Sequence, residues 1–183
     1  MIQSLESLHR AAQERGSRVL AVAAAQDAEV LLAVDAARKL GIATAILVGD
    51  EEQIRAIAQA HDIPLEPHRI LPEPDKVQAC RTAVKLVRDG QADAVMKGIV
   101  DTSIILKAVL DKEIGLRDAP VLSHVALFQV PGYDRLLYVT DAAMNIAPDL
   151  EAKKHIVSNA VKVAHALGNP NPIVACLCAV EKV

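Results

Sequence analysis

Short apolar runs alternate with amphipathic segments through the first half of the chain, and this alternation restricts the fold more than any other feature. Residues 18–25 (Arg-Val-Leu-Ala-Val-Ala-Ala-Ala) and 44–48 (Thr-Ala-Ile-Leu-Val) are almost without polar side chains. Strands of this kind are typical of a parallel sheet that helices cover on both faces. Segments with apolar residues at helical spacing follow each run, so the pattern predicts successive strand and helix units.

Further strands are predicted at residues 69–71 and 93–97, with helices at 28–40, 51–60, 77–90 and from residue 102 onward. Repeated strand-helix units give a parallel sheet with right-handed crossovers and helices on both faces. The core must consist of small and branched aliphatic residues, because 52% of the 183 residues are hydrophobic but only one Phe, two Tyr and no Trp occur. We therefore predict an α/β fold in which residues 1–118 form a parallel-sheet, three-layer domain.

The pattern changes at Ala119. Residues 121–130 and 136–140 flank Pro131-Gly-Tyr-Asp134, which predicts a β-hairpin. Asp149 is in position to cap a long helix, and residues 173–178 predict one more buried strand. A second substructure is thus predicted to start at residue 119.

Charge and cysteine usage exclude several classes of protein. Twenty basic and twenty-three acidic residues give a net charge of −3 without a basic run, so no nucleic-acid partner is expected. The amino terminus lacks the apolar region of a signal peptide and no run is long enough for a membrane span, which predicts a cytoplasmic protein with no membrane partner. The three cysteines are expected to be small buried side chains, and the six scattered histidines give no metal-ligand spacing, so no metal is expected.

The turn after the strand at 93–97 is the best candidate for a ligand site. Lys97 and Gly98 lie where ligands gather in parallel sheets, and Thr102 or Ser103 is placed to cap the helix that follows. Helix-start amides attract an anion, glycine allows close backbone approach, and Lys107 lies one helical turn after Ser103. We predict a phosphate site; the alternative is a surface lysine with hydroxyls that only cap the helix.

Other candidates come from residues 119–183. Arg135 is either a phosphate contact or a surface charge on the hairpin. Ser123 and His124 are adjacent, so in a strand they face opposite ways and do not alone form a nucleophile and its base. Asp141 and Asn145 lie in the loop after the hairpin, where a turn and a helix cap also explain them. Neither a P-loop nor a dinucleotide-binding glycine motif occurs, which argues against a nicotinamide cofactor.

Several of these motifs together resemble the phosphate acetyl/butyryltransferase family, and its butyryl branch in particular. They are Met96-Lys-Gly98 with Thr102-Ser103, residues 109–117 (Val-Leu-Asp-Lys-Glu-Ile-Gly-Leu-Arg), Leu122-Ser-His-Val125 and residues 131–149 (Pro-Gly-Tyr-Asp-Arg-Leu-Leu-Tyr-Val-Thr-Asp-Ala-Ala-Met-Asn-Ile-Ala-Pro-Asp). The resemblance covers essentially the whole chain. It implies conversion of a short-chain acyl-CoA, here butyryl-CoA, and phosphate to an acyl phosphate and coenzyme A, with no tightly bound cofactor.

The resemblance also implies a fold of the isocitrate/isopropylmalate dehydrogenase type and a homo-oligomer, a dimer or larger. The phosphate and acyl-CoA site is expected to include Lys97, Gly98, Thr102, Ser103, Lys107 and Arg135, with Ser123, His124, Asp141 and Asn145 lining the cleft. Family members often carry arginine where this chain has Lys107, which keeps the charge but not the bidentate geometry. They also continue well past the position of Val183. The resemblance therefore implies that residues 119–183 are the beginning of a second α/β domain, truncated at its end, and that the catalytic residues lie beyond Val183. A phosphate acetyltransferase, or a noncatalytic module that binds coenzyme A or forms oligomers, remains the alternative.

Overall fold

The computed structural model describes residues 2–177, which form two compact units. One unit comprises residues 9–118, and the other combines residues 2–8 with residues 119–177. Helix α1 (Leu5–Glu14) spans the junction between the two in the chain. Residues 2–8 therefore pack with the later part of the chain, whereas the sequence placed them in the first domain. The predicted domain limits of 1–118 and 119–183 stay a prediction for the whole protein.

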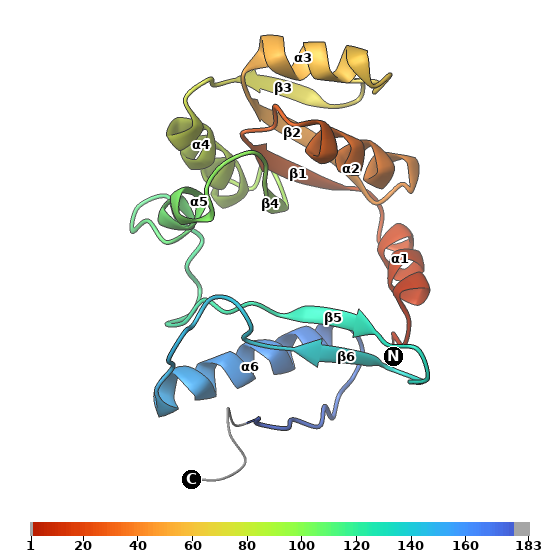
Figure 1. The fold of residues 1–183 in the computed structure, drawn as a ribbon, viewed down its shortest axis with the longest axis vertical. Helices are drawn as coiled ribbons and strands as arrows, with labels where there is room; N and C mark the ends of the chain where they lie inside the picture. Colours follow the sequence, from red (N-terminus) through yellow and green to blue (C-terminus); the bar gives the residue numbers. More distant parts are fainter. Residues whose placement is uncertain (1, 178–183) are drawn as a thin grey trace. The chain divides into compact units, whose positions relative to one another are not determined.

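A four-stranded parallel sheet forms the centre of residues 9–118 (Figure 1). Its strands are β1 (Arg18–Ala23), β2 (Ala43–Gly49), β3 (Arg69–Pro72) and β4 (Ala94–Lys97), in the spatial order β3-β2-β1-β4. Val22 pairs with Leu47 of β2 on one side and with Met96 of β4 on the other. The predicted α/β fold with a parallel sheet is confirmed.

Helices cover both faces of this sheet. Helices α2 (Ala28–Lys39) and α3 (Glu51–Ala60) pack on one face, and α4 (Lys76–Arg88) and α5 (Thr102–Val109) pack on the other. Successive strand residues point to opposite faces, so Val22 and Leu47 contact the first pair of helices while Ala23 and Val48 contact the second. Both faces are apolar for this reason, which accounts for the uninterrupted apolar runs in the sequence.

An aspartate begins each of the first three helices that follow a strand. The side chains of Asp27, Asp50 and Asp75 accept hydrogen bonds from backbone amides in the first turns of α2, α3 and α4, respectively. Such caps satisfy amides that lack a helical partner, typically worth about 1 kcal/mol each. The caps hold the starts of α2, α3 and α4 at the carboxyl-terminal edge of the sheet.

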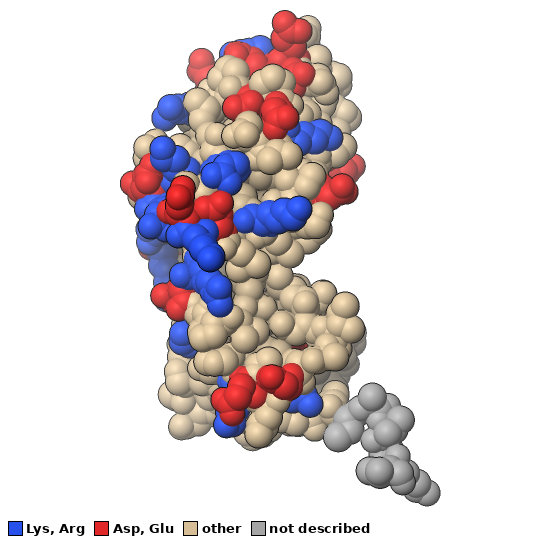
Figure 2. Space-filling model, turned by 90° about the vertical axis from the view of Figure 1, so that its left-hand side faces the viewer, with Lys and Arg blue, Asp and Glu red and all other residues tan. Residues whose placement is uncertain are grey.

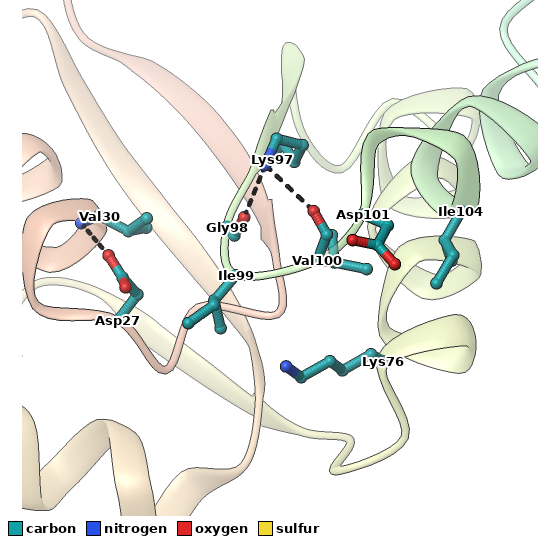
Figure 3. A pocket seen from close by; sticks show the side chains of 9 residues that line it. All are labelled: Asp27, Val30, Lys76, Lys97, Gly98, Ile99, Val100, Asp101 and Ile104. Carbon is teal, nitrogen blue, oxygen red and sulfur yellow. Dashed lines mark hydrogen bonds between the residues drawn. The ribbon is translucent and has the colours of Figure 1, made fainter.

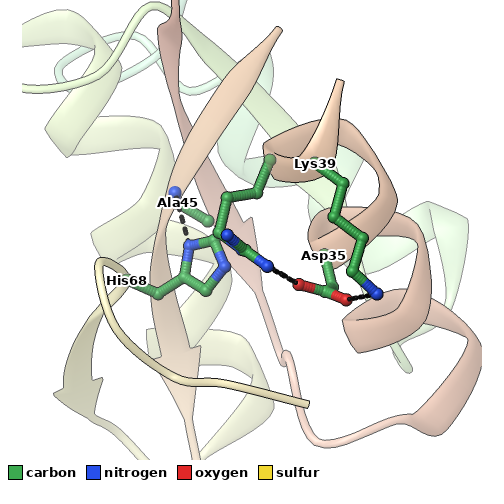
Figure 4. A network of polar contacts seen from close by, with 5 residues as sticks. Asp35, Lys39, Ala45 and His68 are labelled. Atoms are coloured by element: carbon green, nitrogen blue, oxygen red, sulfur yellow. Dashed lines mark hydrogen bonds and ion pairs between the residues drawn. The ribbon is translucent and has the colours of Figure 1, made fainter. Parts of the chain in front are cut away.

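A polar network lies beside β2, away from that edge (Figure 4). The Asp35 carboxylate is only 4% exposed and accepts hydrogen bonds from Arg38 and Lys39, whose nitrogens lie 2.8 and 2.7 Å away. The bond from Lys39 is the main reason that the pKa of Asp35 lies below its ordinary value. Nδ1 of His68 accepts a hydrogen bond from the Ala45 amide at 3.1 Å. Burial, with a contribution from the Arg38 charge, lowers the pKa of His68, so the ring is neutral and can accept this bond.

The second unit contains an antiparallel hairpin and a long helix. Strands β5 (Ala126–Gln129) and β6 (Leu136–Val139) pair antiparallel, which confirms the predicted hairpin in a shorter form. Helix α6 (Leu150–Ala166) is capped as predicted, because the Asp149 side chain accepts a hydrogen bond from the Ala152 amide at 2.8 Å. Residues 2–5 are tied to this unit through the Ile2 amide, which donates to Leu167, and the Leu5 amide, which donates to the Gln129 side chain.

The predicted strand at residues 173–178 is wrong for its described part. Residues 173–177 form no strand, and the side chains of Ile173 and Leu177 are each 93% exposed. A strand needs a neighbour to pair its backbone groups, and among residues 2–177 no strand pairs with this segment. Cys80 is buried as predicted, Cys176 is exposed against prediction, and Cys178 lies outside the described residues. No helix within residues 2–177 combines the length and the apolar character needed to cross a bilayer.

Candidate functional site

A crevice of about 420 Å³ lies at the carboxyl ends of β1 and β4. The chain passes from β1 to β2 and β3 on one side of the sheet and then returns to β4 on the other side of β1. The connections from β1 and β4 thus run to opposite faces, and such a switch point is where open α/β sheets bind ligands. The crevice is lined by Asp27, Val30, Lys76, Lys97, Gly98, Ile99, Val100, Asp101 and Ile104 (Figure 3).

The turn after β4 forms one side of this crevice and is held tightly to β1. The amides of Gly98 and Ile99 donate hydrogen bonds to the carbonyls of Ala23 and Ala24, at 2.8 and 2.9 Å. A Cβ on Gly98 would lie 2.1 Å from the Ala24 oxygen and 2.6 Å from the Ala23 oxygen. Glycine is required here by the backbone of β1, whereas the sequence suggested close approach to a ligand.

The Lys97 side chain is engaged within the same turn. Its Nζ donates hydrogen bonds to the carbonyls of Gly98 and Val100, at 3.2 and 3.1 Å (Figure 3). The ammonium therefore ties two carbonyls of the turn together and restrains the path of the chain from β4 to α5. Lys97 and Gly98 both line the crevice, and each has a clear structural task. Their role in binding an anion stays a prediction.

The start of α5 differs from the prediction. Asp101 is the N-cap residue, and the helix begins at Thr102, so neither Thr102 nor Ser103 caps it. The Asp101 side chain makes no capping hydrogen bond and lines the crevice instead. Both hydroxyl residues lie exposed in the first turn of α5, and Lys107 lies in its last turn; these three are not among the residues that line the crevice.

A further group of predicted residues comes together in the second unit. Nδ2 of Asn145 donates hydrogen bonds to the Leu122 carbonyl at 3.0 Å and to the Asp141 carboxylate. Burial raises the pKa of Asp141, but hydrogen bonds from Asn145 and from backbone amides, including that of His124, outweigh it and bring the pKa below its ordinary value. The loop at 141–145 is thereby joined to the segment before β5.

Asn159 of α6 completes this group, and the sequence reasoning missed it. Its Nδ2 donates to the Ser123 hydroxyl at 2.9 Å and to the Val121 carbonyl at 3.0 Å. Ser123, His124, Asp141 and Asn145 thus lie in one network, held between the loop and α6. The Arg135 guanidinium pairs with the adjacent Asp134 at 3.2 Å, and both side chains are exposed.

Two more residues of the crevice were not predicted from sequence. Asp27 and Lys76 each stand where a strand gives way to a helix, and that position was the signal available for them. Within the part of the chain that the structure describes, no three His, Cys, Asp or Glu side chains are grouped as metal ligands. The crevice therefore offers lysine ammonium groups, aspartate carboxylates and backbone groups, a set suited to an oxyanion ligand.

The family model "Phosphate acetyl/butaryl transferase" matches residues 73–183, more than half of the chain. The chain belongs to this family. It is 48% identical to phosphate butyryltransferase of Clostridium acetobutylicum over 181 residues, which are 99% of this chain and 60% of that protein. It is 42% identical to phosphate acetyltransferase of Rhizobium meliloti over 151 residues, 82% of this chain and 48% of that one.

Solved structures of phosphotransacylases resemble the fold as well. The crystal structure of a branched-chain phosphotransacylase from Enterococcus faecalis aligns with a TM-score of 0.68 and 31% identity, covering 82% of this chain and 52% of that one. The fold of the chain is therefore one that this phosphotransacylase has as well. The chain spans about 60% of the length of the Clostridium protein.

Proposed function

We propose that the protein transfers a short acyl group, butyryl in the first place, between coenzyme A and inorganic phosphate. The observation that carries the proposal is the match to a phosphate butyryltransferase over 99% of this chain at 48% identity. The proposal concerns the whole protein, because the chain covers 60% of that relative's length. It includes acyl-CoA and phosphate as substrates and no tightly bound cofactor.

The proposed reaction makes clear demands on a site. A phosphate oxygen attacks the thioester carbonyl, a C–O bond forms, and the tetrahedral intermediate carries its charge on the former carbonyl oxygen. The C–S bond then breaks, its electron pair goes to sulfur, and a proton converts the thiolate to the thiol of coenzyme A. A site must hold phosphate against its hydration and stabilise the oxyanion, which cations and backbone amides do well.

In this proposal the phosphate lies in the crevice at the Lys97-Gly98 turn. Cationic side chains and the starts of α2, α4 and α5 at the same edge of the sheet support this assignment. Thr102, Ser103 and Lys107 are assigned as further contacts because α5 begins beside the crevice. Arg135, with the network of Ser123, His124, Asp141 and Asn145, is assigned to acyl-CoA contacts in the second unit.

The wider features of the proposal rest on the family. They are a fold of the isocitrate/isopropylmalate dehydrogenase type with domains at 1–118 and 119–183, a homo-oligomer, and a cytoplasmic location, where acyl-CoA is available. Catalytic residues beyond Val183 also belong to the proposal. Phosphate acetyltransferase activity is the second candidate, favoured by the 42% identity to the Rhizobium meliloti enzyme.

An assay with butyryl-CoA, acetyl-CoA and phosphate tests both candidates. The protein is expressed with whatever coding sequence follows residue 183, and release of coenzyme A is followed with a thiol reagent. We expect phosphate-dependent release, faster with butyryl-CoA. Faster turnover of acetyl-CoA would favour the second candidate. No release from any short acyl-CoA would refute the proposed activity, and binding of coenzyme A without turnover would favour a noncatalytic module.

A further inference from the structure

Two lysines reach the crevice between β1 and β4, but their ammonium groups differ in what they contact. Lys97 already donates to two backbone carbonyls of its own turn. Lys76 also lines the crevice, yet among residues 2–177 its ammonium makes no hydrogen bond and no ion pair. Of these two cations, only Lys76 is available to a ligand without a structural contact being broken.

The position of Lys76 directs this charge into the crevice. It is the first residue of α4, directly after the cap Asp75, and Figure 3 shows its side chain extending below Ile99 toward the Asp27 side of the crevice. A cation in the first turn is unfavourable for a helix, because the positive end of the helix dipole lies there. Helices α2 and α3 carry glutamate in their first turns, whereas α4 carries no acidic residue there. Helix α5 carries no acidic residue in its first turn either, and Lys76 is exposed, so its ammonium is accessible at the crevice although helix formation does not favour it there.

The carboxylates of the crevice differ in the same way. Asp27 is engaged, since its Oδ1 accepts a hydrogen bond from the Val30 amide at 3.1 Å. Asp101 makes no capping hydrogen bond, so its carboxylate is open to a ligand that can donate one. The crevice thus offers an ammonium that binds an oxyanion and a carboxylate that accepts an O–H. Protonated phosphate oxygens and phosphate oxyanions occur together in inorganic phosphate.

We propose that Lys76 is the side chain that binds a phosphoryl group in this crevice, while Lys97 holds the turn in shape. The inference rests on the proposed function, since it names the residue that would bind that reaction's phosphate. Inorganic phosphate and the phosphate groups of coenzyme A share the required chemistry. The O–H acceptor at Asp101 favours inorganic phosphate over the pyrophosphate of coenzyme A, whose diester groups carry no O–H. The 3′-phosphate of coenzyme A is a monoester that can carry one, so a bisphosphate probe has to distinguish it from inorganic phosphate.

The test is a titration of the protein with two probes. Backbone amide shifts of residues 98–101 are followed by NMR during titration with inorganic phosphate and, separately, with adenosine 3′,5′-bisphosphate. Lys76→Gln removes the charge, Lys76→Arg keeps it, and Lys85→Gln removes a charge from the same helix outside the crevice. Phosphate dependence of coenzyme A release is measured on the same variants.

We expect Lys76→Gln to weaken phosphate binding about tenfold, as for loss of a hydrogen bond to a charged group. Lys76→Arg restores most of the affinity, and Lys85→Gln leaves it unchanged. An effect confined to the bisphosphate would assign the site to coenzyme A phosphates instead. Equal affinities in Lys76→Gln and the wild type for both probes, or no shifts at residues 98–101, would overturn the inference. Binding that depends on Lys76 in a protein without acyl transfer would refute only the proposed function.

Discussion

Replacing Gly98 by alanine should destabilise residues 9–118 severely. The new Cβ would lie 2.1 and 2.6 Å from the carbonyl oxygens of Ala24 and Ala23, where ordinary contacts begin at 3.4 Å. Neither oxygen belongs to a movable side chain, so the turn must shift away from β1 by about 1 Å, an overpacking that typically costs about 1–3 kcal/mol. That shift would also break the hydrogen bonds from Gly98 and Ile99, at 2.8 and 2.9 Å.

Two lost backbone hydrogen bonds add about 1–3 kcal/mol, so the expected loss is about 4 kcal/mol of unfolding free energy. Urea denaturation followed by circular dichroism should show the midpoint at least about 1 M lower than in the wild type. Gly49→Ala is the matched control. Its Cβ would meet Gln26 Oε1, the far end of a side chain, at 2.3 Å, and the nearest backbone atom, the Ala25 nitrogen, only at 3.0 Å.

We expect Gly49→Ala to cost about 1 kcal/mol, the typical value for a tolerated core change. The reasoning is refuted if Gly98→Ala unfolds within about 1 kcal/mol of the wild type, or if the two variants lose the same stability. Either result would mean that the turn after β4 can move away from β1 at little cost.

Three further predictions concern titration and polar contacts. The pKa of His68 is lowered in the folded state and is 6.5 in the unfolded state, so the unfolded protein takes up the proton first and stability falls as the pH drops below 6.5. His68→Asn keeps an acceptor for the Ala45 amide and should make the urea midpoint less dependent on pH in this range. An unchanged pH dependence would contradict the prediction. The pKa of Asp111 should be about 2, mainly because the Ile114 and Glu113 amides donate hydrogen bonds to its carboxylate and secondarily because of Arg81. Arg81→Gln should therefore raise this pKa only in part, as followed by NMR. A return to 3.8 would show that Arg81 is the main cause. Asn159→Ala should lower the free energy of unfolding by about 1–3 kcal/mol, because the Val121 carbonyl and the Ser123 hydroxyl lose their hydrogen-bond donor. Asn159→Gln keeps an amide donor and is the control. Equal thermal unfolding of the two variants would argue against this role of Asn159.

The basic side chains of α4 differ in what they contact. Lysine and arginine side chains gather on the face that Figure 2 presents, the side on which α4 and α5 lie in Figure 1. Two arginines of α4 have partners within the unit: Arg81 pairs with Asp111 at 3.0 Å, and Arg88 donates to the Gly115 carbonyl at 2.9 Å. Lys85 lies on the same helix, is exposed and is outside the crevice, which makes it a suitable comparison for Lys76.

Much of the fold could be predicted because its signals are local. The strand at 18–25, the helix after it and the cap at Asp149 follow from apolar periodicity and from the preference of aspartate for helix starts. The segment at 173–178 shows where this fails. Its composition is that of a buried strand, but a strand is made by pairing with a neighbour, and no described strand pairs with residues 173–177. Composition cannot supply the partner.

The sequence by itself determined the α/β class, the parallel sheet and the position of the Lys97-Gly98 turn at the end of a strand. Only the tertiary structure decided what these residues do. Gly98 is required by the carbonyls of β1, which lies some seventy-five residues earlier in the chain, since its partners are Ala23 and Ala24. Lys97 contacts carbonyls of its own turn, and Lys76 of α4 brings a second ammonium to the crevice. The physical reason is that the crevice is lined by side chains from several loops and helices that are far apart in the sequence. The order of the strands in the sheet decides which of these side chains lie next to one another.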